Sequence, residues 1–137
     1  MRLKTLESKV RYRISRSKDN VFLPKDFADL GQRDQVSRVL RSLIGTGDVL
    51  KIGYGLYAKA TYSRIFNKTQ PVASLPELAR EALNKLGVQT GPTYFEKLYN
   101  ERKSTQVPTG RVIGVKERVS RKIGYGASEI IYERIPQ

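Results

Sequence analysis

The chain has 137 residues, of which 39% are apolar, a size and composition typical of one ordinary domain or two very small ones with a real core. Its 26 Lys and Arg against 13 Asp and Glu give a net charge of +13, which favours a polyanionic partner, with nucleic acid first and an anionic membrane second. Without cysteine or histidine it has no disulfide, thiolate nucleophile, imidazole base or usual zinc ligand, so we expect no catalytic residues, metal or cofactor.

The positive charge is concentrated in the first half of the chain. Residues 1–70 hold 15 basic and six acidic residues, a net charge of +9, and the remainder holds 11 basic and seven acidic residues, a net charge of +4. No run approaches the ~18 apolar residues of a membrane span, and the opening MRLKTLESKVRYR lacks the apolar core of a secretory signal. We therefore expect a cytoplasmic protein with no membrane partner.

Apolar periodicity predicts three helices in the first half. Leu3, Leu6, Val10 and Ile14 recur at helical spacing and predict a first helix with a basic exterior. After a short strand at 21–23, a second helix is expected from Pro24, a residue suited to the first turn, to Gly31. The third helix has a buried stripe and is followed by the glycines of Gly45-Thr46-Gly47. That stripe comprises Val36, Val39, Leu40, Leu43 and Ile44. Two short helices joined by a turn of a few residues make a helix-turn-helix.

The outward face of the third helix carries side chains that could read a DNA groove. At ~100° per residue this face comprises Asp34, Gln35, Ser37, Arg38, Arg41 and Ser42. Arginine can bind guanine and glutamine can bind adenine through two hydrogen bonds each, so the face offers base recognition as well as charge. Arg33 lies nearer the buried edge and is expected to anchor a phosphate. A solvated helix face is the alternative interpretation.

The pentapeptide KIGYG at Lys51–Gly55 lies between two β-prone runs, 49–52 and 56–59, and predicts a hairpin whose glycines adopt positive φ. A hairpin after a reading helix is a wing, which would place Lys51, Tyr54 and Lys59 near the DNA backbone or minor groove, with Tyr57 in the core. A nucleotide-binding loop is disfavoured because strand leads here to strand. The residues expected to contact DNA are Lys25, Gln32, Arg33, Gln35, Ser37, Arg38, Arg41, Lys51, Tyr54 and Lys59.

The second half predicts a smaller α+β domain after a linker. Residues 63–73 lack periodicity and are expected to be a linker, whereas Ser74 and Glu77 have the spacing of a helix capping box. A further helix is expected from Pro92 to about Arg102, with an aromatic side in the core formed by Tyr94, Phe95, Leu98 and Tyr99. Three short strands follow Arg111, and the second KIGYG, at 122–126, is expected to be a hairpin turn and not an internal repeat.

Two segments carry a family resemblance. VFLPKDFADLGQRDQVSRVLRSLIGTGDVLKIGYGLY resembles the winged-helix segment of AbiEi-type antitoxins of bacterial type IV toxin–antitoxin systems, and Ser104 to Ile135 resembles the C-terminal segment of that family. The most specific matches are PKDF at 24–27 and TQVP at 105–108, and the chain departs from the family's acidic, Gly-Pro-containing turn at 117–120. The resemblance implies a repressor that binds its operator DNA and counters a nucleotidyltransferase-like toxin, with reading helix Gln32–Ile44 and wing Lys51–Lys59.

The expected fold is therefore α+β: an N-terminal winged helix-turn-helix at 1–62, a linker at 63–73 and a C-terminal domain of helices and an antiparallel sheet at 74–137. On double-stranded operator DNA it would act as a monomer or a homodimer. A winged-helix module that binds only protein is the alternative. An enzyme is the third possibility, and no cluster of acidic residues with metal-ligand spacing supports it.

Overall fold

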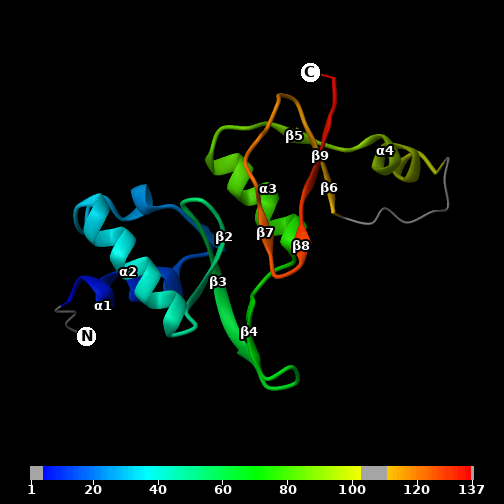
Figure 1. Cartoon of the computed structure of the whole chain (residues 1–137). Helices are drawn as coiled ribbons and strands as arrows, with labels where there is room; N and C mark the ends of the chain where they lie inside the picture. The colour runs from blue at the N-terminus through cyan, green and yellow to red at the C-terminus, as the bar shows by residue number, and fades with distance from the viewer. Residues whose placement is uncertain (1–4, 103–110, 137) are drawn as a thin grey trace. The chain divides into compact units, whose positions relative to one another are not determined.

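A computed structural model describes residues 5–102 and 111–136 of the chain. The fold is α+β, and the chain divides into two compact units, residues 1–73 and 74–137 (Figure 1). TQVP at 105–108 lies outside the described residues. Each unit has its own apolar core.

Two α-helices and one short 3₁₀ helix lie in the described part of the first unit. Helix α1 spans Leu6–Arg16 and begins at Thr5, whose hydroxyl accepts a hydrogen bond from the Ser8 N–H at 3.0 Å. Helix α2 spans Arg33–Gly45, close to the expected reading helix. Both helices bury apolar side chains in one cluster with the 3₁₀ helix η1 and the sheet. The cluster contains Val10, Ile14, Phe22, Phe27, Val36, Leu40, Leu43, Val49 and Tyr57. The expected inward position of Tyr57 is confirmed, since its exposed fraction is 5%.

The expected helix from Pro24 to Gly31 is only a single 3₁₀ turn, η1, at Pro24–Phe27. An α-helix would require the carbonyl of Asp26 to accept a hydrogen bond from the N–H of Leu30. Instead Leu30 N–H donates to the carbonyl of Phe27 at 2.9 Å, and the Asp26 carbonyl accepts from Arg13 Nη1 at 3.1 Å. A side chain of α1 thus takes the backbone acceptor that the next α-helical turn would use.

A four-stranded sheet completes the first unit. Strands β1 (Val21–Phe22), β2 (Val49–Gly53) and β3 (Leu56–Ser63) lie in the order β1-β3-β2, and β4 (Lys68–Pro71) pairs with the second half of β3. All these pairs are antiparallel. The segment 63–73, expected to be a linker, instead contains the end of β3 and the whole of β4, since Ser63 and Lys68 to Pro71 are paired in this hairpin.

The second unit contains two helices and five short strands in its described part. Helix α3 (Leu75–Lys85) begins at Ser74, whose hydroxyl accepts from the Glu77 N–H as the capping pattern predicted, and α4 spans Tyr94–Asn100. The strands are β5 (Thr90–Gly91), β6 (Val112–Val115), β7 (Gly124–Tyr125), β8 (Ser128–Glu129) and β9 (Ile131–Arg134). One sheet has the order β5-β6-β9, and β7 and β8 form a separate hairpin.

The expected antiparallel sheet is wrong for its central pair, since β6 and β9 are parallel. Parallel neighbours need a crossover connection, and residues 116–130, which include the β7–β8 hairpin, provide it. The aromatic core expected on α4 is also wrong. Tyr94, Phe95 and Tyr99 are 65%, 56% and 43% exposed, and α4 has no buried residue.

Both KIGYG copies lead into a hairpin, but the turn falls on Tyr54 and Gly55 in the first copy and on Gly126 and Ala127 in the second. Gly55 joins β2 to β3 with φ of 67°, and Gly126 joins β7 to β8 with φ of 61°. Each pentapeptide ends in a glycine in the left-handed region, whereas Gly53 and Gly124 lie in strands and do not adopt positive φ. The expectation of positive φ at the glycines of the tip therefore holds only for the last glycine of each copy.

Candidate nucleic-acid interface

The outward face of α2 is an exposed basic surface of the first unit. Gln32, Arg33, Gln35, Arg38 and Arg41 are all exposed, and Ser37 is half-buried. The opposite face buries Val36, Leu40 and Leu43 completely, so packing fixes the direction in which the polar face points. A rigid helix of about 20 Å, at 1.5 Å per residue, can enter a major groove.

Two of these polar residues bond within their own helix. Gln35 Oε1 accepts from the N–H of Gln32 at 3.4 Å, which caps the first turn, and Arg41 Nε donates to the carbonyl of Ser37 at 3.4 Å. Both bonds are long, and both leave other donors of the same side chains available. The described residues give the side chains of Arg33 and Arg38 no hydrogen bond or ion pair.

The β2–β3 hairpin presents one aromatic and one lysine side chain. Tyr54 occupies the turn with 80% of its surface exposed, and Lys51 is exposed on β2. Lys59 differs from what the sequence suggested, because it is half-buried and its Nζ donates to the carbonyl of Ser17 at 3.0 Å. That bond joins β3 to the end of α1, so Lys59 has a structural role. Lys25 is exposed on η1, the helical turn that precedes α2 in the chain.

Three carboxylates of the first unit pair with arginines of α1, whereas the described residues give the arginines of α2 no ion pair. Arg13 binds Asp29 through two short contacts, and Arg11 lies 3.1 Å from Asp48 and 3.5 Å from Glu7. Sequence periodicity could not separate these framework arginines from interface arginines, because both kinds lie on polar helix faces. The two kinds of arginine differ in whether an acidic residue distant in sequence, such as Asp29 or Asp48, lies beside them in the fold.

A family profile matches residues 8–136, nearly the whole chain. The chain belongs to DUF6088, a family of unknown function. No curated protein and no solved structure matches it. The function of this DUF6088 protein must therefore be inferred from its own residues.

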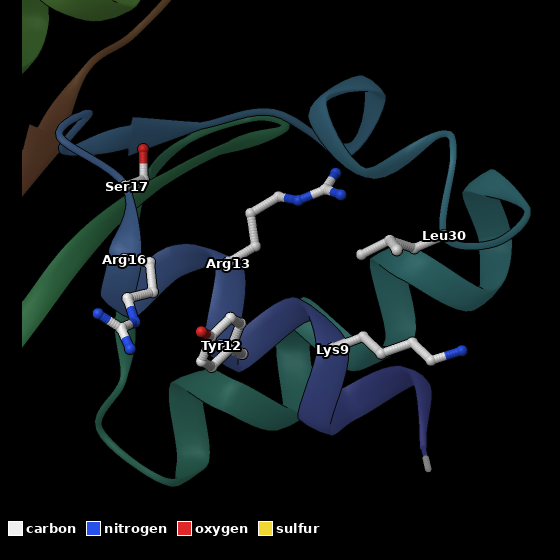
Figure 2. A pocket seen from close by; sticks show the side chains of 6 residues that line it. All are labelled: Lys9, Tyr12, Arg13, Arg16, Ser17 and Leu30. Carbon is white, nitrogen blue, oxygen red and sulfur yellow. The ribbon is translucent and has the colours of Figure 1, made fainter. Parts of the chain in front are cut away.

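A solvent-open depression of about 500 Å³ lies beside α1 of this DUF6088 protein (Figure 2). Three cationic side chains line it together with three others: Lys9, Arg13, Arg16, Tyr12, Ser17 and Leu30. The Arg16 guanidinium lies 5.3 Å from the centre of the Tyr12 ring, a cation–π contact, while Arg13 is engaged with Asp29. The depression adds positive charge to the surface, but its lining does not define a particular ligand.

Two other kinds of site are absent from the described part of the chain. There, no group of three or more His, Cys, Asp or Glu side chains could hold a metal ion. Across residues 5–102 and 111–136, no helix is long and apolar enough to cross a membrane. The basic face of α2 and the β2–β3 turn remain the strongest candidate site, and their chemistry suits phosphates and base edges.

Proposed function

We propose that this protein binds double-stranded DNA through its first unit, with α2 as the reading helix and the β2–β3 hairpin as a wing. The main support is the charge arrangement: Glu7, Asp29 and Asp48 pair with Arg11 and Arg13, while α2 keeps its arginines exposed. Much of the net charge of +9 over residues 1–73 is then available on the solvent side of the unit. This is the electrostatic footprint of a nucleic-acid-binding protein.

The chain order supports a winged helix-turn-helix. Helix α1, strand β1, η1, α2 and the β2–β3 hairpin follow one another, and β1 pairs with β3 at the side opposite β2. A short helical turn before α2, a connecting loop at 28–32 and a hairpin after it are the parts from which such domains are built. In this proposal η1 takes the place of the first helix of the motif.

The resemblance to AbiEi-type antitoxins gives this DNA binding a context. In that context the protein represses its own operon, as a monomer or a homodimer, and acts as the antitoxin to a nucleotidyltransferase-like toxin. The second unit would then contact the toxin. The exposed aromatic side of α4 favours a protein partner there, since exposed apolar clusters often mark interaction sites.

The test is binding of the full chain to a duplex taken from upstream of its own gene, followed by fluorescence anisotropy over a salt series. Six or more phosphate contacts predict a loss of affinity of about 10³-fold between about 50 and 200 mM salt. The double variant Arg38→Ala/Arg41→Ala should lose affinity for this duplex by about 10-fold or more. Arg118→Ala removes an exposed arginine from the second unit and is the matched control.

Affinity that is insensitive to salt, or that is unchanged in the double variant, would contradict the proposal. Absence of DNA binding together with co-purification of a protein partner would favour the alternative of a protein-binding module.

A further inference from the structure

The β3–β4 hairpin extends as a two-stranded ribbon from the four-stranded sheet of the first unit (Figure 1). The first three residues of β3, Leu56 to Ala58, are buried, whereas Thr61 and Tyr62 are exposed. Strand β3 pairs with β1 and β2 only as far as Lys59 and with β4 from Ala60 onward. Beyond residue 60, no third strand of the described chain pairs with the ribbon.

Apolar side chains gather at the tip of this ribbon. Ile65 is 87% exposed, Phe66 is 64% exposed and Tyr62 is 56% exposed. The tip is nevertheless an ordered turn. Phe66 N–H donates to Ser63 Oγ at 3.3 Å, Tyr62 and Asn67 share a side-chain hydrogen bond, and Asn67 adopts the left-handed conformation that asparagine tolerates. Backbone and side-chain bonds thus hold a turn that presents Ile65 and Phe66 to solvent.

The charge around the tip points to a polyanion. Arg64 and Lys68 flank Ile65 and Phe66 and are both exposed. No Asp or Glu occurs from residue 49 to residue 76, so no acidic residue near the tip in sequence offsets the charges of Arg64 and Lys68. Arg64 and Lys68 lie on either side of the apolar pair in sequence, and cations in this position favour a groove lined by phosphates over an apolar protein surface.

We propose that the β3–β4 hairpin is a second DNA-contacting arm, in which Ile65 and Phe66 insert between base steps from the minor groove and Arg64 and Lys68 bind the flanking phosphates. Isoleucine and phenylalanine are among the side chains that partly unstack base pairs in this way, and basic residues beside them favour the narrow groove. The inference rests on the proposed DNA binding by α2 and gives that binding a second contact.

The dimensions of the ribbon suit this role. From Lys59, the last β3 residue paired with β2, to Ser63, the end of β3, there are four residues, or about 14 Å at 3.4 Å per residue, and the turn at 64–67 carries Ile65 beyond that point. Half a helical turn of DNA is about 17 Å. The tip lies at the end of β3 opposite the β2–β3 turn, so a ribbon of this length would place it on a groove other than the one beside the wing.

The experiment compares the wild-type full chain with Ile65→Ser/Phe66→Ser on upstream duplexes that carry a fluorescent adenine analogue at successive positions. Unstacking of the analogue raises its fluorescence. The wild type should raise it at one or two adjacent steps, and the double variant should abolish the rise and weaken binding by about tenfold. Because both side chains are exposed, the substitution should leave folding intact. Ile131→Ser removes an isoleucine that is 61% exposed in the second unit and should change neither reading.

The outcomes separate the two proposals. If the wild type binds no duplex, the proposed function fails and the arm fails with it. If the wild type binds but the fluorescence is the same in the double variant, the wedge is overturned while DNA binding by α2 stands. The wedge is also overturned if the double variant loses only self-association in sedimentation, or only binding to anionic vesicles, with its DNA readings unchanged.

Discussion

Arg13 and Asp29 form a two-pronged ion pair that joins α1 to the loop after η1. Arg13 Nη1 lies 2.6 Å from Asp29 Oδ1, and Nη2 lies 2.7 Å from Oδ2. The side-chain hydrogen bond is the main cause that lowers the pKa of Asp29 below its ordinary 3.8, and the same bond raises the pKa of Arg13. Folding therefore favours the charged form of the pair, which holds the loop that leads into α2.

Acid should weaken the first unit through Asp29. A carboxylate with a lowered pKa in the folded state adds stability that is present above pH 3.8, its unfolded value, and is lost as the pH falls through the folded value. Asp29→Asn should lower the free energy of unfolding at neutral pH and reduce its dependence on pH below about 4. Urea denaturation across this range, followed by circular dichroism, measures both effects.

The variant Arg13→Lys tests whether the two-pronged geometry of the ion pair matters beyond its charge. Lysine keeps the charge but cannot make the two-pronged contact or reach the Asp26 carbonyl in the same geometry. We expect an intermediate loss of stability. An Asp29→Asn protein with the wild-type acid midpoint would show that the pair contributes nothing to folding.

The core beneath α2 should be sensitive to truncation. Leu40 has no exposed surface and lies among the apolar side chains of α1, η1 and the sheet. Leu40→Ala should destabilise the first unit by about 2–5 kcal/mol, since it removes buried methyl groups and leaves a cavity. Ile65→Ala removes a similar volume from a side chain that is 87% exposed, and should change the stability by less than about 0.5 kcal/mol. Equal losses in the two variants, measured by urea denaturation, would contradict this assignment of the core.

Sequence patterns predicted the elements whose signal is local. The stripe of Val36, Leu40 and Leu43 repeats often enough to define α2, and Gly55 of KIGYG defines the turn of the first hairpin. The exposed positions of Arg38 and Arg41 follow from the same periodicity. Long-range contacts had no such signal. The bond from Arg13 to the Asp26 carbonyl, the acceptor that a further α-helical turn would use, joins residues that no pattern relates.

Burial and strand pairing in the second unit also depend on contacts that sequence periodicity does not predict. An aromatic stripe on α4 has the spacing of a core face, but periodicity does not say whether another element covers it, and Tyr94, Phe95 and Tyr99 are exposed. The parallel pairing of β6 and β9 depends on the crossover between them, at 116–130. Likewise, the polar residues of the β3–β4 ribbon resemble a linker because so little of the ribbon is buried.

Replacing two glycines of the first unit by alanine should change the free energy of unfolding in opposite directions. Gly55 has φ of 67°, a conformation that costs an alanine about 1–2 kcal/mol, so Gly55→Ala should destabilise the hairpin. Gly45 is the last residue of α2 and lies outside the left-handed region, and a methyl group added at its Cα would meet no atom within 4 Å. Gly45→Ala should therefore stabilise the unit by about 0.4–1 kcal/mol. Thermal unfolding of both variants tests these two predictions. A change of Tm in the same direction for both variants would contradict them.

Alkaline pH should weaken the second unit through Tyr132. Burial raises the pKa of this phenol above its ordinary 10.0, and its hydroxyl donates to the carbonyl of Arg121 at 2.7 Å. A group with a raised pKa adds stability that is fully present below pH 10.0, its unfolded value, and is lost as the pH rises through the folded value. Tyr132→Phe should lose the hydrogen bond at neutral pH but show a smaller further loss above pH 10.0. Identical alkaline transitions in the wild type and the variant would remove Tyr132 as the cause.

Arg38 and Lys51 should contribute to DNA binding in different ways. Arg38 lies on the outward face of α2, where a guanidinium can bind a base edge, whereas Lys51 lies on β2, where an ammonium suits a phosphate. Arg38→Ala should cost about 1–3 kcal/mol on the upstream duplex and much less on a scrambled duplex. Lys51→Ala should weaken binding to both duplexes equally and reduce the slope of log affinity against log salt by about 1. Anisotropy titrations on both duplexes at several salt concentrations separate the two patterns. If Arg38→Ala weakened the two duplexes equally, α2 would contact only the backbone and the reading of bases would have to lie elsewhere.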